Sequence, residues 1–428
     1  MKIVLYKTIH HFFPSFGNWL KEMNDPRNEN AITYSLSLLL WTGILLFLVK
    51  LGSRRQINFQ FNSEEVKRNL SLLVGEEIEE IAHDGTLEYL LERFQPEEMC
   101  RLRKKMINRL IRMRCLENDR LFGYYKIVID ASGYLVFKER HCQHCLKQEK
   151  NGKVLYYHPI LEAKIVSKDG IALSIDSEFI ENPEEGVSIQ DCELAAFRRL
   201  AERLKKSFSQ LKICLLLDAL YANKGVFKIC RKNNWKYIIT FKKGSMPAAY
   251  EEYIALKKLN QDCWGQYIRE GINQEYRWVN AIDYEGYDLN VLECQETKSD
   301  KKTRFVWLTN FDIDKNNYHY LANKGGRLRW KIENEGFNMQ KKGGYNLEHP
   351  YSKHPVGLKN FYLLLQIAHI INQLMEKGSL LKNEIKKTFG SIRNIARRLL
   401  ESLRTSVLDE TDLEIINSSH FQIRLQGP

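Results

Sequence analysis

The sequence predicts a mixed α/β protein with helical regions at both ends. Apolar residues recur at helical intervals up to about residue 120, whereas the chain from about residue 124 is rich in β-branched and aromatic residues. After residue 190, helical and strand patterns alternate, which favours a mixed sheet covered by helices. We therefore expect a helical region over 1–120, an α/β region over 121–355 and a helical region over 356–428.

The N-terminal region contains one long uncharged segment, Ala31–Val49, followed by Lys50 and two arginines. Its 19 residues are almost enough to cross a bilayer. Because only one such segment exists and the rest of the chain resembles a soluble protein, we predict a buried helix, or a helix pair broken near Thr42-Gly43. A membrane anchor is the alternative interpretation.

The chain is strongly basic, with 65 Lys and Arg against 53 Asp and Glu and a formal net charge of +12. Such an excess favours a polyanionic partner, either nucleic acid or an anionic membrane. A predicted helix that begins at Pro96 concentrates this charge, and its basic face either is simply solvated or contacts phosphates. The candidate DNA-binding residues in the two helical regions are Arg101, Arg103, Lys104, Lys105, Arg397 and Arg398.

In the central region, three antiparallel strands are expected first, with Asp169-Gly170 as a hairpin turn. Helices and strands then alternate until a largely β insertion over about 245–300 interrupts them. The expected strands are 124–137, 154–166, 171–179, 213–218, 237–241, 287–293 and 304–309, and the expected helices are 191–208, 225–233, 356–376 and 383–404.

Three acidic residues form the main functional hypothesis. Asp130 and Asp218 each follow an apolar run that reads as a central strand, and Glu333 lies on a predicted helix that is otherwise basic. Two divalent cations held by such carboxylates can activate an attacking oxygen and stabilise a leaving oxygen during phosphoryl transfer. Mg²⁺, with Mn²⁺ as a substitute, prefers these hard oxygen ligands. Each acid taken alone is more simply a turn or capping residue, so the hypothesis rests on all three together.

The helix that carries Glu333 adds candidate phosphate contacts. Arg329 lies four residues before Glu333 and shares its face, and Lys341 and Lys342 follow about two turns later. The simpler interpretation is an amphipathic helix with an internal ion pair. Glu335 is the alternative third acid.

These stretches resemble bacterial insertion-sequence transposases that carry a DDE triad on an RNase H-like fold. Arg329-x3-Glu333 fits their Tyr-x2-Arg-x3-Glu-x6-Lys signature, whose Tyr position falls on Gly326 and whose Lys position falls on Gln340. The resemblance covers most of the chain, since it extends to Gln190-Asp-Cys-Glu, Asp218-Ala-Leu-Tyr-Ala and Gly52-Ser-Arg-Arg-Gln-Ile-Asn.

The resemblance implies a DNA transposase that uses two Mg²⁺ ions at Asp130, Asp218 and Glu333 to cleave transposon ends and to transfer the freed 3′ strand into target DNA. It implies double-stranded DNA as partner, action as a homodimer on DNA and a cytoplasmic, nucleoid-associated location without a membrane. Two alternatives are a nuclease of the same fold that does not transfer strands and a catalytically inactive DNA-binding relative.

Three secondary signals allow more than one interpretation. His141-Cys-Gln-His-Cys145, with His158 further on, has the spacing of half a zinc site, but a polar hairpin tip is the simpler interpretation. Trp264 or Trp278 could stack on an extruded base, although tryptophan is more often buried in the core. The nine scattered cysteines favour reduced thiols in a cytosolic protein.

Overall fold

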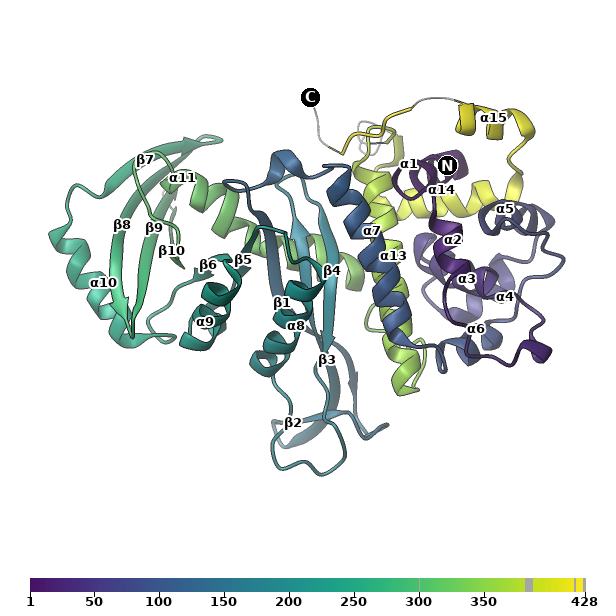
Figure 1. The fold of residues 1–428 in the computed structure, drawn as a ribbon, viewed down its shortest axis with the longest axis horizontal. Coiled ribbons are helices and arrows are strands. Elements are labelled where there is room, and N and C mark those ends of the chain that lie inside the picture. The colour runs from purple at the N-terminus through teal and green to yellow at the C-terminus, as the bar shows by residue number, and fades with distance from the viewer. Residues whose placement is uncertain (300, 382–387, 419–420, 426–428) are drawn as a thin grey trace.

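The computed structural model describes residues 1–299, 301–381, 388–418 and 421–425, and it confirms a mixed α/β protein. Figure 1 shows a helical part at one end of the molecule and a long sheet that runs from its middle to the other end. Helices α7 and α13 pack on each other and lie between the sheet and the other helices of the two chain ends, α1–α6, α14 and α15 (Figure 1).

The N-terminal part is helical, as predicted. It comprises α1 (Lys2–Phe12), α2 (Phe16–Lys21), α3 (Leu36–Leu48), α4 (Ile57–Gln60), α5 (Glu64–Val74), α6 (Asp84–Leu91) and α7 (Pro96–Arg112), with 3-10 turns at Glu29–Ala31, Arg54–Gln56 and Glu117–Asp119. Helix α7 begins at a proline and has Glu97 and Glu98 in its first turn, where acids are stabilised by the helix dipole.

Helix α3 is the long apolar segment, and all of its residues are buried. It packs against α2, α5, α6 and α13, which explains why it can be apolar on every side. The predicted break at Thr42-Gly43 is wrong, because the helix continues through both residues. Gly43 instead allows α13 to approach closely, since a Cβ there would lie 2.8 Å from Leu364 Cδ1. Among the helices of the described residues, none has both the length and the apolarity needed to cross a bilayer.

The sheet has the strand order β2-β3-β1-β5-β6-β10-β9-β8-β7, with β4 paired to β3. Strand β5 is parallel to both β1 and β6, and the other pairs are antiparallel. The strands are β1 (Tyr125–Phe137), β2 (Leu146–Lys150), β3 (Lys153–Val166), β4 (Ala172–Phe179), β5 (Ile213–Leu217), β6 (Lys236–Thr240), β7 (Trp264–Arg269), β8 (Ile272–Tyr284), β9 (Tyr287–Lys298) and β10 (Lys301–Thr309).

All the predicted strands are present, and the predicted hairpin turn holds Gly170 at a φ of +86°. Strand β2 was not predicted, because its sequence Leu-Lys-Gln-Glu-Lys has no apolar alternation and it pairs only with β3 at the sheet edge. The insertion is largely β, as expected, but it begins with a helix, α10 (Pro247–Leu259). Its strands β7–β9 extend the central sheet through β10.

Helices α8 (Glu193–Ser207) and α9 (Lys224–Asn233) lie where the sequence placed them, with a 3-10 turn at Ala219–Tyr221 after β5. The described C-terminal helices are α13 (Pro355–Lys377), α14 (Ile392–Thr405) and α15 (Glu410–Ser418). Helix α13 packs on α3, α7 and β4, while α14 packs on α5 and α1, so the helices of the two chain ends form one unit. The predicted helix 383–404 begins later, at Ile392, and its residues 383–387 lie outside the described residues.

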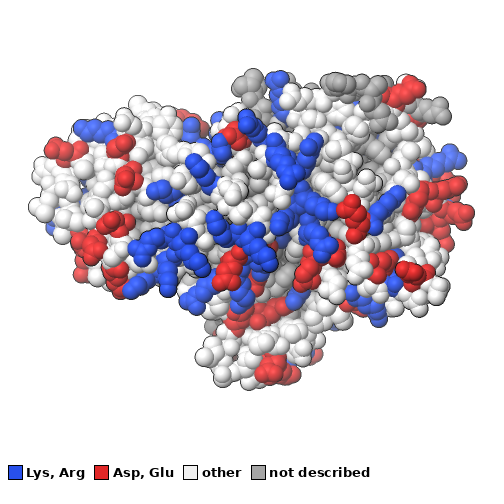
Figure 2. Space-filling view, in the orientation of Figure 1, with Lys and Arg blue, Asp and Glu red and all other residues white. Residues whose placement is uncertain are grey.

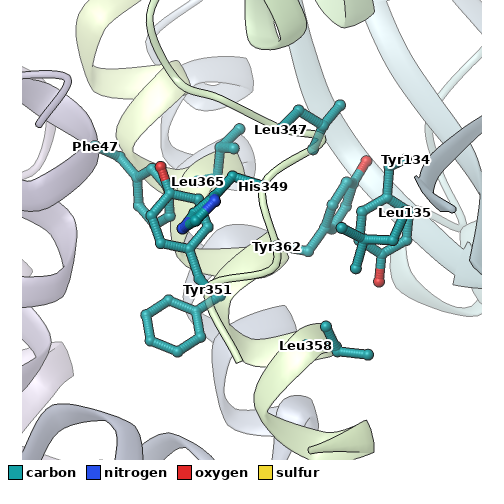
Figure 3. A pocket seen from close by; sticks show the side chains of 10 residues that line it. Phe47, Tyr134, Leu135, Leu347, His349, Tyr351, Leu358, Tyr362 and Leu365 are labelled. Carbon is teal, nitrogen blue, oxygen red and sulfur yellow. The ribbon is translucent and has the colours of Figure 1, made fainter. Parts of the chain in front are cut away.

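A small pocket of about 20 Å³ marks the junction between this helical unit and the sheet (Figure 3). Phe47 reaches it from α3, Tyr134 and Leu135 from β1, and Tyr362 from α13. Tyr134 and Tyr362 pack with their ring centroids 5.3 Å apart. The sheet and the helical unit therefore share a continuous apolar core, which fixes β1 against α13.

Candidate active site

The two aspartates lie at the same level of neighbouring parallel strands. Strands β1 and β5 are in register with Val128 opposite Leu216, so Asp130 and Asp218 each lie two residues further on. Adjacent strands are about 4.8 Å apart, which places the two residues side by side. Asp218 directly follows β5, as predicted, whereas Asp130 lies in the middle of β1, because the strand continues to Phe137.

Each aspartate also makes a local backbone contact. Asp218 caps the following turn, where its Oδ1 accepts a hydrogen bond from the amide of Leu220 at 2.9 Å. Asp130 Oδ1 accepts one from the amide of Ala131 at 3.1 Å. These contacts hold Oδ1 of each carboxylate in place, and neither of them involves Oδ2.

Glu333 lies on an irregular helical segment that packs on the sheet. The segment comprises α11 (Tyr318–Tyr320), a π-helical turn (Leu321–Gly325), a 3-10 turn (Gly326–Trp330), a second π-helical turn (Ile332–Phe337) and α12 (Asn338–Lys342). The regular helix predicted here is therefore wrong in detail. π-helical turns interrupt helices frequently at functional sites.

Two glycines explain how this segment packs so closely on β6 and β10. A Cβ on Gly325 would lie 2.4 Å from Ile238 Cδ1, and one on Gly326 would lie 2.4 Å from Trp307 Nε1. The tyrosine position of the signature falls on Gly326, so the structure has no room for that side chain. The lysine position falls on Gln340, which is fully buried and donates to Gln366 at 2.9 Å.

Arg329 links the irregular segment to β1. Its Nη1 lies 3.4 Å from Asp130 Oδ2, and the guanidinium is mostly buried. Arg329 was predicted to contact DNA, and in this structure its ion-pair partner is Asp130. Glu335, the alternative third acid, pairs with Lys331 at 3.0 Å and lies close to Gly170 in the β3–β4 turn. The ion pair of Glu335 favours Glu333 as the third acid.

The electrostatics of Asp130 show that several acids gather around it. Burial raises the pKa of Asp130 to about 7, and although Arg329 opposes this shift, Glu193, Asp218 and Glu333 add to it. Burial, together with the charge of Asp218, also raises the pKa of Glu193, which accepts a hydrogen bond from the Tyr221 hydroxyl at 2.6 Å. We call Asp130, Asp218, Glu333 and Glu193 the acidic cluster.

The donor set of the acidic cluster fits divalent cations. Among the described residues, Asp218, Glu193 and Glu333 make no ion pair, and Arg329 is the ion-pair partner of Asp130. Carboxylate oxygens are the ligands that Mg²⁺ and Mn²⁺ prefer. Yet the acidic cluster is not a compact ligand set: the part of the chain that the structure describes holds one group whose ligand atoms lie within 4.8 Å of one another, and it consists of histidines and cysteines.

A groove of about 650 Å³ opens beside Asp218 and is rich in cations. Its walls come from β6, β10, the segment after β6 and the irregular helical segment. Sequence reasoning missed most of these groups, because the residues are far apart in the chain. The charged and aromatic residues that line the groove are Asp218, Phe241, Lys242, Lys243, Tyr250, Arg304, Phe305, Trp307, Arg327, Arg329 and Trp330.

The tryptophans proposed for base stacking differ in exposure. Trp278 is buried and stacks on Tyr318 with ring centroids 5.3 Å apart, so it belongs to the core. Trp264 is half exposed on β7. Trp330, which the sequence did not single out for stacking, is 51% exposed and lines the groove beside Asp218.

The basic residues of α7 that were predicted to contact DNA differ in how deeply they are buried. Arg103 is 1% exposed and donates to Ser174 and Ser177 of β4, with Asp176 as its ion-pair partner at 3.2 Å. Its assignment as a DNA contact is therefore wrong, because the helix turns this residue toward the sheet. Arg101 is exposed beside Glu98, Lys104 is half-buried, and Lys105 pairs with Glu22 at 2.7 Å.

The remaining basic candidates lie at the surface. Lys341 donates to the carbonyl of Gly133 at 3.3 Å, which brings it to β1 near Asp130, and Lys342 is exposed. Arg397 and Arg398 are exposed on α14. Figure 2 shows one face of the molecule, where Lys and Arg side chains gather across the middle, over α7, α8 and α9.

Comparison with protein-family models and with curated proteins finds no match for this chain. The functional assignment therefore depends on the residues and their geometry.

Proposed function

We propose that this protein is a DNA transposase that cleaves transposon ends and joins the freed 3′ strand to target DNA. The observation that carries the proposal is the register of Asp130 and Asp218 on adjacent parallel strands, with Glu333 close enough to perturb the same carboxyl group. A phosphoryl-transfer site needs this combination of carboxylates fixed on a rigid sheet.

The fold supports the proposal. Three antiparallel strands (β1, β3 and β4) precede a helix and two parallel strands, with α8 before β5 and α9 between β5 and β6. This succession is the one expected of an RNase H-like domain, and the β-rich insertion before Glu333 matches the organisation that the resemblance implies. We therefore assign an RNase H-like domain with a β-rich insertion as part of the proposal.

Each residue has a distinct role in the proposed reaction. Asp130, Asp218 and Glu333 would hold two divalent cations, which supply a nucleophilic oxygen and stabilise the leaving oxygen. Arg329 and Lys341 would contact phosphates on either side of Glu333, and Lys242 and Lys243 would bind the strand that enters the groove. Arg329 would exchange its contact with Asp130 for a phosphate when DNA and cations enter.

Incubation of the purified protein with DNA that carries the ends of its flanking element, with Mg²⁺ or Mn²⁺, tests the proposal. We expect metal-dependent nicks at the element ends, followed by joining of the 3′ strands to target DNA, and mapping of the broken strands reveals whether hairpins form. Cleavage without joining would instead identify a nuclease. DNA binding without any cleavage would identify an inactive relative.

A further inference from the structure

Four metal-ligating side chains that the proposed reaction does not use converge where β1, β2 and β3 meet. His141, Cys142 and Cys145 come from the loop between β1 and β2, and His158 comes from β3, where it pairs with Leu135 of β1. Each offers one ligand atom, and these four atoms lie within 4.8 Å of one another. We call these four residues the His/Cys cluster.

Four of the six separations between the ligand atoms are close to the edges of a tetrahedron around one metal ion. The two Sγ atoms are 3.4 Å apart, and each lies 3.4 Å from His158 Nε2. The Nε2 atoms of His141 and His158 are 3.1 Å apart. Zinc bonds of about 2.3 Å to sulfur and about 2.0 Å to nitrogen give tetrahedral edges of about 3.3–3.8 Å. The four separations lie within a few tenths of an ångström of these edges, and the remaining two, from His141 to the cysteines, are no longer than 4.8 Å.

Neither a disulfide nor hydrogen bonding alone accounts for the His/Cys cluster. A disulfide needs sulfur atoms about 2.05 Å apart, so Cys142 and Cys145 are separate thiols here. A purely hydrogen-bonded cluster is also unfavourable, because thiols are weak donors and acceptors. Cys145 and His158 are both buried, and buried polar atoms normally have strong partners.

The backbone around the two cysteines is held in place by Asn182. The side-chain amide of Asn182 donates to the carbonyl of Cys145 at 3.0 Å, and its backbone amide donates to the carbonyl of His144 at 3.2 Å. The His144 ring turns away from the cluster, since its Nδ1 lies 2.8 Å from the carbonyl of Asn182. The loop is therefore shaped to present Cys142 and Cys145 on one side.

We propose that His141, Cys142, Cys145 and His158 bind one structural zinc ion. A Cys₂His₂ set is complete for tetrahedral zinc and leaves no position for a substrate, which is typical of structural rather than catalytic sites. On binding, the two cysteines release their thiol protons to solvent and bind as thiolates, while the histidines bind as neutral imidazoles. No electron transfer is involved. The proposal is independent of the proposed DNA chemistry.

The zinc ion would also fix the segment that leads into the acidic cluster. Asn182, which holds the zinc loop, accepts a hydrogen bond from the amide of Asp191 at 3.2 Å through its Oδ1. Glu193 of the acidic cluster lies two residues after Asp191, at the start of α8. Nearby, Gln190 and Lys147 of β2 exchange two hydrogen bonds between the Gln190 side chain and the Lys147 backbone. Zinc therefore secures both β2 and the approach to α8.

The metal content of the purified full-length protein tests this proposal. After dialysis against a weak chelator, we expect one equivalent of zinc per chain in the wild type and a loss of more than about 90% of it in Cys145→Ser and Cys142→Ser. Cys192→Ser is the matched control, because Cys192 is an exposed thiol outside the cluster. It should retain all of the zinc.

Cobalt substitution gives a second readout that needs no variant to fold. Titration of metal-free wild type with Co²⁺ should produce the visible absorption of a tetrahedral site and a thiolate charge-transfer band at one equivalent. The proposal is overturned if zinc is absent after growth in zinc-supplemented medium, if iron takes its place, or if Cys142 and Cys145 prove to be a disulfide by mass spectrometry. An octahedral cobalt spectrum, or equal zinc loss in Cys192→Ser, would also overturn it.

Discussion

Two groups of candidate metal-ligating side chains lie along strand β1 and its neighbouring strands, and they are built in opposite ways. Asp130 of the acidic cluster lies on β1, and His158 of the His/Cys cluster pairs with Leu135 on the same strand. Five residues of strand separate the two levels, or about 16 Å. The His/Cys cluster has its four ligand atoms within 4.8 Å of one another, whereas the acidic cluster is spread out and one of its acids is paired with an arginine.

If both proposals hold, the His/Cys cluster is a permanent metal site and the acidic cluster is one that assembles with its substrate. A closed set of soft ligands holds one ion and needs no other partner. An open set of carboxylates leaves cation positions for DNA oxygens to complete, so its final geometry forms only when DNA binds. The two proposals thus place a structural site and a catalytic site at two levels of β1 and its neighbouring strands.

The largest expected effect is on the acidic cluster. Asp218→Asn should lower DNA-end cleavage by more than about 100-fold while DNA affinity stays within about twofold, because the amide cannot replace a metal-binding carboxylate. Glu333→Gln should behave in the same way. The measurement is single-turnover cleavage with a parallel binding titration.

Glu335→Gln is the matched control for Glu333, since Glu335 lies two residues away and pairs with Lys331. It should keep cleavage within a few-fold of the wild type. A large loss in Glu335→Gln together with normal cleavage in Glu333→Gln would move the third acid to position 335.

The second prediction distinguishes the two sites by how much removal of their metal ions changes the melting temperature. Removal of zinc with a strong chelator should lower the melting temperature by about 5 °C or more, since metal bound only by the folded state stabilises it. A chelator selective for Mg²⁺ should leave the melting temperature almost unchanged. Differential scanning calorimetry at neutral pH measures both changes in melting temperature. Equal changes with the two chelators would mean that the two sites do not differ in whether the metal ion is bound permanently.

Substitution of the lysines in the groove beside Asp218 should have an intermediate effect on DNA affinity. Lys242→Ala combined with Lys243→Ala should weaken DNA affinity about 10-fold at low salt and reduce the salt dependence by one to two phosphate contacts. Lys301→Ala with Lys302→Ala is the control, because these exposed residues of β10 do not line the groove. Electrophoretic or fluorescence titrations at several salt concentrations measure the slope, and an equal loss in both double variants would exclude a specific groove contact.

The smallest effect is a pH-dependent change in stability of the metal-free protein. Burial and the neighbouring acids raise the pKa of Asp130 to about 7, above its ordinary value, so the folded state is progressively destabilised as pH rises from about 4 through 7. Asp130→Asn removes this penalty. Its stability relative to the wild type should therefore be greater at pH 8 than at pH 5 in denaturant titrations.

Addition of Mg²⁺ at pH 8 should reduce the difference in stability between Asp130→Asn and the wild type, because a cation offsets the repulsion between the carboxylates of the wild type. A difference that is the same at both pH values would mean that Asp130 is not in a repulsive acidic environment.

The sequence was most informative where one residue pattern determines local structure. The apolar strands β1 and β5 and the aspartates on them follow from runs of β-branched and aliphatic residues, and α7 follows from Pro96 and its first-turn acids. The strand pattern did not predict β2, because this edge strand consists mostly of charged and polar residues. It also failed for the segment around Glu333, because the contacts of Gly325 and Gly326 with β6 and β10 are tertiary.

Side-chain environment was the harder part to predict. Arg103 and Arg101 look equivalent on a basic helix, yet one is buried against β4 and the other is exposed. The groove lysines and Arg304 converge only through the sheet order, and His158 joins the two cysteines only because β3 pairs with β1. Burial and pairing between distant segments decide these cases, and neither is visible in a single sequence without the fold.

The most direct test of the acidic cluster as a catalytic metal site is anomalous diffraction from crystals of the protein with DNA ends and Mn²⁺. We predict manganese between Asp130 and Asp218, with Glu333 as a further ligand and Arg329 moved to a phosphate. Crystals saturated with Mn²⁺ that bind DNA but show no manganese at Asp130 and Asp218 would contradict this prediction.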